Sequence, residues 1–115
     1  MSVEKQIDYI EIPVTDPSKA RDFFAQMFGW SFEEWGPDYI SFKDGRIDGG
    51  FRRTTEPSPP NGVLVVFYSM DLERDAQRVQ QLGATISQDI FSFPGGRRFH
   101  FVDPTGTEFA IWSDR

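Results

Sequence analysis

Apolar and polar residues alternate near the start of the chain. Over residues 7–14, Ile10 and Ile12 fall on one side, and Tyr9 and Glu11 fall on the other. An alternation with a period of two predicts a strand that is buried on one face only.

A capped amphipathic helix is predicted next. Asp16 is a favourable N-cap, and Pro17 suits the first helical turn because its φ is fixed and its missing N–H is not needed there. Apolar residues then recur at spacings of three and four until Gly29, which supplies the left-handed conformation that ends many helices. These residues are Ala20, Phe23, Phe24, Met27 and Phe28, and we expect them to pack in the core.

The same order of elements returns in the second half of the chain. Asp71 stands 55 residues after Asp16, and Gly83 stands 54 residues after Gly29, which indicates an internal duplication. The predicted strands are 7–14, 31–35, 39–42 and 49–53 in the first half, then 63–68, 85–88, 97–102 and 107–112 in the second. The glycine pairs Gly49-Gly50 and Gly95-Gly96 are interpreted as turns or bulges.

This order predicts an α+β fold of two tandem βαβββ modules within a single domain. Module one covers about 7–55, a proline-rich linker covers 56–62, and module two covers about 63–113. We expect mixed, curved sheets with the helices on their outer faces and a concave cavity on the inner face. A ferredoxin-like βαββαβ fold of similar size is an alternative, but it leaves the strands after Gly83 unexplained.

Alternation along each strand predicts which side chains face the helices and which line the cavity. We assign to the helix side Ile10, Ile12, Val63, Val65, Phe67, Phe99, Phe101, Phe109 and Ile111. We assign to the cavity Tyr9, Glu11, Leu64, Val66, Tyr68, Arg98, His100, Val102, Glu108, Ala110 and Trp112.

Composition narrows the classes of partner. The chain has 115 residues, a formal net charge of −6 and no cysteine, so disulfides and thiolate metal sites are excluded, and nucleic acid is not expected as a partner because phosphate contacts need a basic surface. The basic pairs Arg52-Arg53 and Arg97-Arg98 are interpreted as solvated edge charges. No apolar run is long enough to cross a membrane, and residues 1–6 do not look like a signal peptide, so we expect a cytoplasmic protein without membrane contact.

Four segments carry a resemblance to a known family: 11–16 (EIPVTD), 23–30 with its Phe-Phe and Phe-Gly-Trp, 49–51 (GGF) and 103–109 (DPTGTEF). In this order and spacing the chain resembles the vicinal oxygen chelate superfamily, which includes glyoxalase I, extradiol dioxygenases and bleomycin- and fosfomycin-resistance proteins. The resemblance implies the duplicated fold described above. It does not imply one activity, because one fold hosts many functions.

The family usually holds a divalent metal with four side chains, two from each module. Position by position, the resemblance places these ligands at Tyr9, Leu64, Ala110 and either Gly49 or Gly50. Tyrosine is a poor ligand for these ions, and the other residues have no side-chain donor. We therefore predict a member of the family without a metal or other cofactor.

Two polar residues are candidates for catalysis. Glu11 lies among apolar neighbours, so we expect it to be paired, either with Arg98 from the other module or with a cationic ligand. His100, the only histidine, is a candidate general base beside a carboxylate. The alternatives are a structural ion pair for Glu11 and, for His100, a side chain satisfied by backbone or water or located at a sheet edge.

The favoured hypothesis is a metal-free protein that binds a small organic molecule, cationic or aromatic, and forms a homodimer, as bleomycin-resistance proteins do. The residues expected to contact the ligand are Tyr9, Glu11, Tyr68, Arg98, His100, Glu108 and Trp112. One alternative is an enzyme of the lyase, isomerase or dioxygenase type that uses Glu11, His100 or an unexpected metal site. The other is a dimeric interaction module without a ligand.

Overall fold

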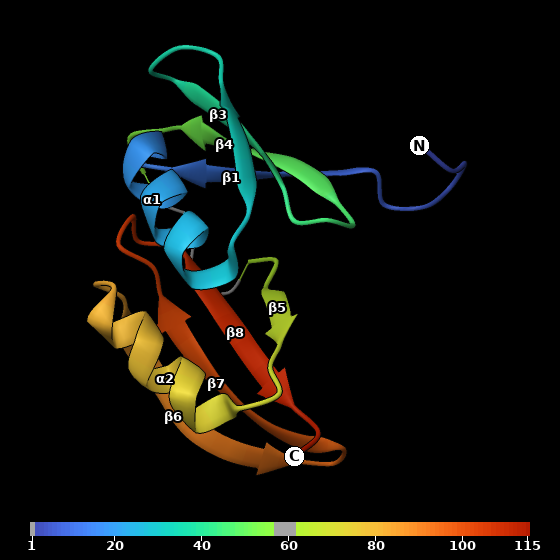
Figure 1. The fold of residues 1–115 in the computed structure, drawn as a ribbon, viewed down its shortest axis with the longest axis vertical. Coiled ribbons are helices and arrows are strands. Elements are labelled where there is room, and N and C mark those ends of the chain that lie inside the picture. Colours follow the sequence, from blue (N-terminus) through green and yellow to red (C-terminus); the bar gives the residue numbers. More distant parts are fainter. Residues whose placement is uncertain (1, 57–61) are drawn as a thin grey trace. The chain divides into compact units, whose positions relative to one another are not determined.

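The computed structural model describes residues 2–56 and 62–115, and these form two compact units that meet between residues 57 and 58 in sequence. The predicted linker, 56–62, falls largely on residues 57–61, which lie outside the described residues. Both units have the element order βαβββ (Figure 1). This order confirms the predicted α+β fold of two βαβββ modules.

The bounds of the elements are as follows. The first unit contains β1 (Tyr9–Val14), α1 (Pro17–Phe28), β2 (Ser31–Glu34), β3 (Tyr39–Lys43) and β4 (Asp48–Arg53). The second unit contains β5 (Val65–Tyr68), α2 (Leu72–Gln81), β6 (Thr85–Phe93), β7 (Gly96–Val102) and β8 (Glu108–Ser113). In the described part of the chain, neither helix is long and apolar enough to cross a membrane.

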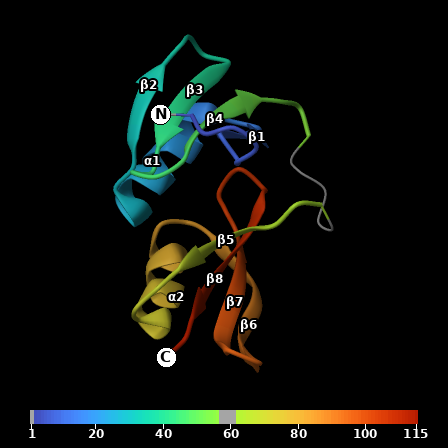
Figure 2. The same ribbon diagram turned by 90° about the vertical axis from the view of Figure 1, so that its right-hand side faces the viewer.

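Each unit forms its own mixed sheet with the same strand order. The first sheet is β1-β4-β3-β2 and the second is β5-β8-β7-β6. The first strand of each unit pairs in parallel with the last, and the remaining pairs are antiparallel. Figure 2 shows β5, β8, β7 and β6 side by side in the second unit. The repeat seen in the sequence is therefore a repeat of topology.

Both helices begin as their sequences predict. The Asp16 carboxylate accepts a hydrogen bond from the backbone N–H of Lys19 (3.2 Å), and the Asp71 carboxylate accepts one from Arg74 (3.1 Å). Gly29 follows α1 with φ of 70°, the left-handed conformation that costs glycine little. The two N-caps satisfy backbone donors that a helix leaves unpaired at its first turn.

Aromatic rings fill the core between α1 and the first sheet. Phe24 of α1 lies 5.3 Å from Phe51 of β4, and Trp30 stacks on Phe42 of β3 at 4.5 Å between ring centroids. Phe24 and Phe51 are fully buried. Ring packing of this kind supplies large buried area from few residues, which a unit of this size needs.

The core of the second unit follows the predicted alternation. Phe99, Phe101, Phe109 and Ile111 are buried, as expected for residues on the helix side, together with Leu72 and Val79 of α2. The Phe101 and Phe109 rings stack at 5.7 Å across β7 and β8. The assignment of Val63 to this core was wrong, because β5 begins at Val65 and Val63 is 95% exposed.

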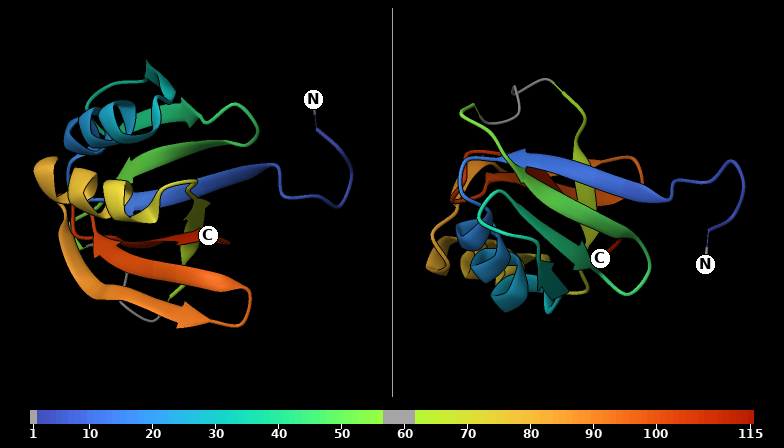
Figure 3. Two further views of the ribbon diagram at one scale, coloured as in Figure 1. Left: turned by 60° about the horizontal axis from the view of Figure 1, so that its bottom comes forward. Right: turned by 90° about the horizontal axis from the view of Figure 1, so that it is seen from above.

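Two further predictions were wrong in detail. The strand predicted at 85–88 extends to Phe93 and forms a long hairpin with β7, drawn in orange in Figure 3. Gly49 and Gly50 do not form a turn or a bulge, since both lie within β4 and pair regularly with β1 and β3. Glycine occurs there because neighbouring aromatic rings occupy the space of its missing side chain, as described below.

Candidate functional site

The face of the first sheet opposite α1 carries polar and aromatic side chains. Strand register places Glu11, Gly50 and Ser41 side by side across β1, β4 and β3, and places Tyr39 beside Arg52. Tyr9 and Glu11 alternate with the buried Ile12 and Val14, so they point away from the helix. We call this the helix-free face of the first sheet.

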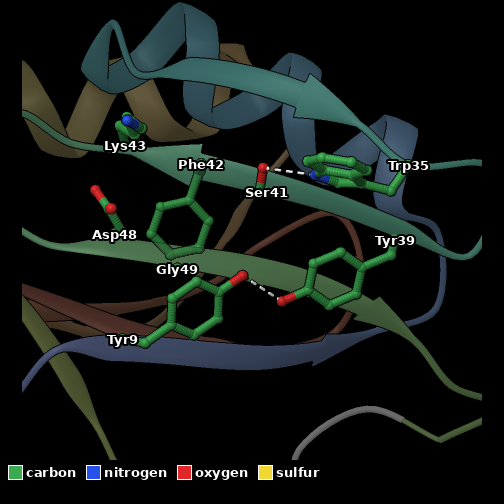
Figure 4. A pocket seen from close by; sticks show the side chains of 8 residues that line it. All are labelled: Tyr9, Trp35, Tyr39, Ser41, Phe42, Lys43, Asp48 and Gly49. Carbon is green, nitrogen blue, oxygen red and sulfur yellow. Dashed lines mark hydrogen bonds between the residues drawn. The ribbon is translucent and has the colours of Figure 1, made fainter.

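A pocket of about 450 Å³ lies on the first sheet (Figure 4). It is lined by Tyr9, Trp35, Tyr39, Ser41, Phe42, Lys43, Asp48 and Gly49. The Trp35 indole N–H donates to the Ser41 hydroxyl (3.0 Å), and the Trp35 backbone N–H donates to the Tyr39 carbonyl (3.0 Å). These two bonds hold the exposed Trp35 ring at the pocket although it lies beyond the end of β2.

The Tyr39 ring lies over Gly50 and fills the space that a side chain at residue 50 would occupy. A Cβ added at Gly50 would overlap the Tyr39 ring, and the hydroxyls of Tyr39 and Tyr9 are hydrogen-bonded to each other. Burial raises the pKa of the Tyr39 hydroxyl, and hydrogen bonds to Tyr9 and Glu11 raise it further. Tyr39 therefore keeps its proton more strongly than an ordinary tyrosine, and its position depends on glycine at residue 50.

Glu11 has a partner within its own module. Its carboxylate lies 3.1 Å from Nε of Arg52, and both side chains are about half exposed. The register of β1 with β4 brings Arg52 within reach on the same face, a partner that was not among those expected. As an exposed ion pair, Glu11 and Arg52 contribute little to stability, on the order of 0–1 kcal/mol. The pairing of Glu11 with Arg98 stays a prediction.

The second sheet also has a helix-free face, formed by alternate residues of β5, β8, β7 and β6. Strand register places Arg98 opposite Trp112, His100 opposite Ala110 and Val102 opposite Glu108. Tyr68 lies beside Trp112, with a ring-centroid distance of 5.2 Å. The structure thus brings five predicted site residues onto one face: Tyr68, Arg98, His100, Glu108 and Trp112.

His100 is buried and has a carboxylate neighbour. Its side chain is 7% exposed, and Nδ1 lies 3.3 Å from Oε2 of Glu108, which also accepts a hydrogen bond from the Ser87 hydroxyl (3.0 Å). An ionised carboxylate only accepts, so this contact favours a proton on Nδ1. The alternative of a histidine at a sheet edge was wrong, because β7 lies between β8 and β6.

Arg98 is surrounded by aromatic rings instead of carboxylates. Its guanidinium carbon lies 5.4 Å from the centroid of Phe91 and 5.7 Å from that of Phe93. Among residues 2–56 and 62–115, Nε of Arg98 and Nε2 of His100 are the buried side-chain nitrogens without a hydrogen-bond partner. The interpretation of Arg98 as a solvated edge charge was therefore wrong, whereas Arg97 pairs with the exposed Glu73.

Irregular pairing of β6 explains how Ser87 and Phe91 reach this face. The register shifts between Ile86 and Gln88 and again between Gln88 and Phe91, on either side of the residue that pairs with His100. Each shift inserts one extra residue in β6, and such bulges redirect side chains. The strand predicted at 85–88 did not reach Phe91 and Phe93, and Ser87 was not among the predicted site residues.

The pocket on the first sheet was also missed, apart from Tyr9. The alternation of Tyr39, Ser41 and Lys43 would have placed these residues on the same face as Tyr9, but sequence alone does not show that β3 lies two strands from β1. The alternation within β3 was visible in the sequence, but the strand order was needed to place its side chains near Tyr9.

The residues at the family's metal position do not fit a metal ion. The Tyr9 hydroxyl is engaged with Tyr39, and the Tyr39 ring fills the space where a ligand side chain at residue 50 would stand. Ala110 is fully buried and has no donor, and Leu64 has none. No group of three or more His, Asp or Glu within residues 2–56 and 62–115 is arranged to hold a metal.

Comparison with known proteins agrees with this architecture. The sequence model of the Glyoxalase/Bleomycin resistance protein/Dioxygenase superfamily matches residues 6–111. No curated protein matches the chain.

Solved structures with the same fold share little sequence with this chain. A glyoxalase/bleomycin resistance protein/dioxygenase family enzyme from Burkholderia phytofirmans PsJN is 18% identical, with a TM-score of 0.82 over 96% of this chain and 99% of its own. TioX from Micromonospora sp. ML1 is 22% identical, with a TM-score of 0.71 over 96% and 99%. Lactoylglutathione lyase from Agrobacterium tumefaciens is 16% identical, with a TM-score of 0.73 over 97% and 96%. At these identities the likeness concerns the fold alone.

Proposed function

We propose, from the premise that this chain belongs to the Glyoxalase/Bleomycin resistance protein/Dioxygenase superfamily, that it binds a small organic molecule without the help of a metal. The observation that carries this proposal is the pocket of about 450 Å³ on the first sheet. Its volume lies in the range of about 300–1,000 Å³ typical of small-molecule sites. The unsuitable residues at the family's metal position support binding by side chains alone.

The lining of the pocket favours a flat guest. The rings of Tyr9, Trp35 and Tyr39 offer aromatic surface, and the Asp48 carboxylate stands at the same pocket. Aromatic faces attract flat and cationic groups, and the net charge of −6 favours the approach of a cation. Lys43, directly opposite Asp48 in the strand register, disfavours a guest with several positive charges.

A thermal-shift screen with planar cationic aromatic compounds tests this proposal. A ligand present at about 100 times its Kd should stabilise the fold by roughly 2.7 kcal/mol. Trp35→Ala should abolish the shift, because it removes one wall and Trp35 is exposed enough to be replaced without unfolding. Met70→Ala is the matched control, since Met70 is equally exposed and lies outside the pocket. The absence of a shift with every compound would contradict the proposal.

A specific contact supports a second candidate function, an enzyme that transfers a proton. Glu108, which accepts a hydrogen bond from Ser87, contacts Nδ1 of His100 and leaves Nε2 without a partner, the arrangement of a general base with an orienting carboxylate. Lactoylglutathione lyase has the same fold, so this fold can carry an enzyme. The shared fold does not mean that the present chain has the same activity. If turnover of a compound is found, His100→Ala should lower kcat by about 10²–10⁴-fold, and unchanged turnover would exclude His100.

The homodimer and the interaction module stay predictions. Light scattering of the purified chain tests both, since a monomer has a mass of 13.2 kDa. A stable dimer that binds no compound of the screen would favour the interaction module over the binding protein.

A further inference from the structure

We propose that the helix-free face of the second sheet contains a site for an organic carboxylate, which Arg98 binds through its free nitrogen beside the imidazole of His100. None of the residues of this site lines the pocket on the first sheet. The ligand class follows from the charge, burial and surroundings of these two side chains.

Arg98 carries a charge that no carboxylate balances. Arg21, Arg52, Arg53, Arg74, Arg97 and Arg115 each lie within 4.0 Å of a carboxylate. Among the described residues, Arg46 and Arg78 have no such neighbour either, but both are exposed to solvent. Arg98 has no such neighbour in the described part of the chain, although it is partly buried and its Nε is fully shielded. A shielded donor without a partner is costly, on the order of 1–3 kcal/mol, so an acceptor is expected there.

His100 is the polar neighbour of Arg98 on this face. Its side chain is 93% buried, its Nδ1 is engaged by Glu108, and its Nε2 has no partner. Residues 98 and 100 alternate along β7, so both side chains project from the same face, about 6.6 Å apart along the strand. The guanidinium of Arg98 presents Nε to a ligand carboxylate, which accepts the hydrogen bond.

The surroundings indicate what the carboxylate is attached to. Phe91 and Phe93 lie under the guanidinium of Arg98, and Trp112 lies 6.3 Å from Phe93. These rings exclude water and offer an apolar surface next to the charged groups. A cation or a metal ion is excluded from this site by the charge of Arg98. An aromatic carboxylic acid fits both the free donor of Arg98 and the rings.

Matched acids and amides test the proposal directly. The full chain is titrated with benzoate and 2-naphthoate, and in parallel with benzamide and 2-naphthamide, by calorimetry and by amide NMR shifts. We expect both acids to bind, with shifts at β6 and β7, and the amides to bind at least tenfold more weakly because they lack the charge. Equal binding of acid and amide, or no binding of either acid at millimolar concentration, would overturn the proposal.

Variants separate the carboxylate site from the rest of the molecule. Arg98→Gln should weaken binding of 2-naphthoate by about tenfold or more, and Arg98→Lys should weaken it to a lesser degree because it keeps the charge but loses the planar fork. Arg97→Gln is the control, since Arg97 pairs with Glu73, and it should leave the affinity unchanged. Full affinity in folded Arg98→Gln would overturn the proposal.

The test also distinguishes this site from the pocket on the first sheet. Trp35→Ala should remove the response to cationic aromatic compounds and leave the affinity for 2-naphthoate unchanged. Arg98→Gln should do the reverse. A loss of both responses in either variant would show that the two sites are one, which would contradict the present assignment.

Discussion

At the scale of single residues, glycine and tyrosine define the first sheet's polar face. Gly50 stands in a regular strand because its missing side chain makes room for Tyr39, and Tyr39 in turn reaches the Tyr9 hydroxyl. The same arrangement removes the space for a metal ligand at residue 50. One absent side chain therefore accounts for a wall of the pocket and leaves no room for a ligand side chain at residue 50.

Gly50→Ala should destabilise the protein and deform the pocket. The new methyl group would overlap the Tyr39 ring, which must move away from its hydrogen bond with Tyr9. We expect a loss of about 1–3 kcal/mol in the free energy of unfolding, measured with urea.

A double-mutant cycle supplies the control. In a Tyr39→Ala background, Gly50→Ala should cost much less, because the overlapping ring is gone. An equal cost in both backgrounds would mean that the backbone conformation, and not Tyr39, demands glycine.

Asp103 should make stability depend on pH in an unusual direction. Burial raises the pKa of its carboxyl above the ordinary value, against the opposing effect of hydrogen bonds from Thr107 and Thr105. A pKa raised on folding means that the folded state holds its proton to a higher pH than the unfolded state does. The stability from this group is thus fully present below the ordinary pKa and is lost as pH rises through the folded pKa.

Asp103→Asn removes this titration while keeping an oxygen that can accept from the backbone N–H groups of Thr105 (3.0 Å) and Thr107 (2.9 Å). We expect the variant to gain stability relative to the wild type as pH rises from the ordinary carboxyl pKa toward neutrality. Urea unfolding at a series of pH values measures the difference. A difference that is constant with pH, or that changes in the opposite direction, would refute the assignment.

At the scale of elements, the two modules keep the same topology but differ in the regularity of one strand. The second strand of the second module, β6, contains two register shifts, whereas its counterpart β2 pairs with β3 without any. The irregular strand brings Ser87 and Phe91 to His100 and Arg98. The irregularity thus occurs beside His100 and Glu108. Bulges are common next to functional sites.

The two helix caps offer a matched pair of substitutions. Asp16→Ala and Asp71→Ala each remove one acceptor from a helix N-terminus, so each should lower the free energy of unfolding by about 1 kcal/mol. Asp16→Asn and Asp71→Asn should restore most of the loss, because asparagine caps about as well as aspartate. Chemical denaturation measures all four variants, and an alanine variant as stable as the wild type would show that its cap is not needed.

At the scale of the whole molecule, the chain has the family's duplicated fold, and its two modules present different side chains on their helix-free faces. The first module presents tyrosines and an exposed Glu11–Arg52 pair, and the second presents His100, Arg98 and aromatic rings. Within residues 2–56 and 62–115, no three His, Asp or Glu side chains are grouped as the ligands of a divalent metal would be.

Removal of metal ions should therefore have no effect on this protein. Elemental analysis should find no stoichiometric Zn, Ni, Mn or Fe, and a chelator should leave the melting temperature unchanged, because a metal that bound the folded state would raise it. One tightly bound equivalent of any of these metals would contradict the prediction.

Periodicity, caps and turn residues were enough to predict the element order, the duplication and most of the core. These features are local: Asp16, Gly29 and the alternation around Ile12 act on neighbours a few residues away. The positions of Phe99 and Phe109 in the core followed from the same alternation. The resemblance then identified the family and the positions without metal donors.

The pairings of the polar residues were decided by the tertiary structure. Glu11 meets Arg52, Tyr39 covers Gly50, and Glu108 orients His100, each across neighbouring strands of a sheet. Such contacts depend on strand order and register, and a shift of one residue sends a side chain to the opposite face. The two shifts in β6 are of this kind, because no local pattern around Gln88 distinguishes a bulge from a regular strand.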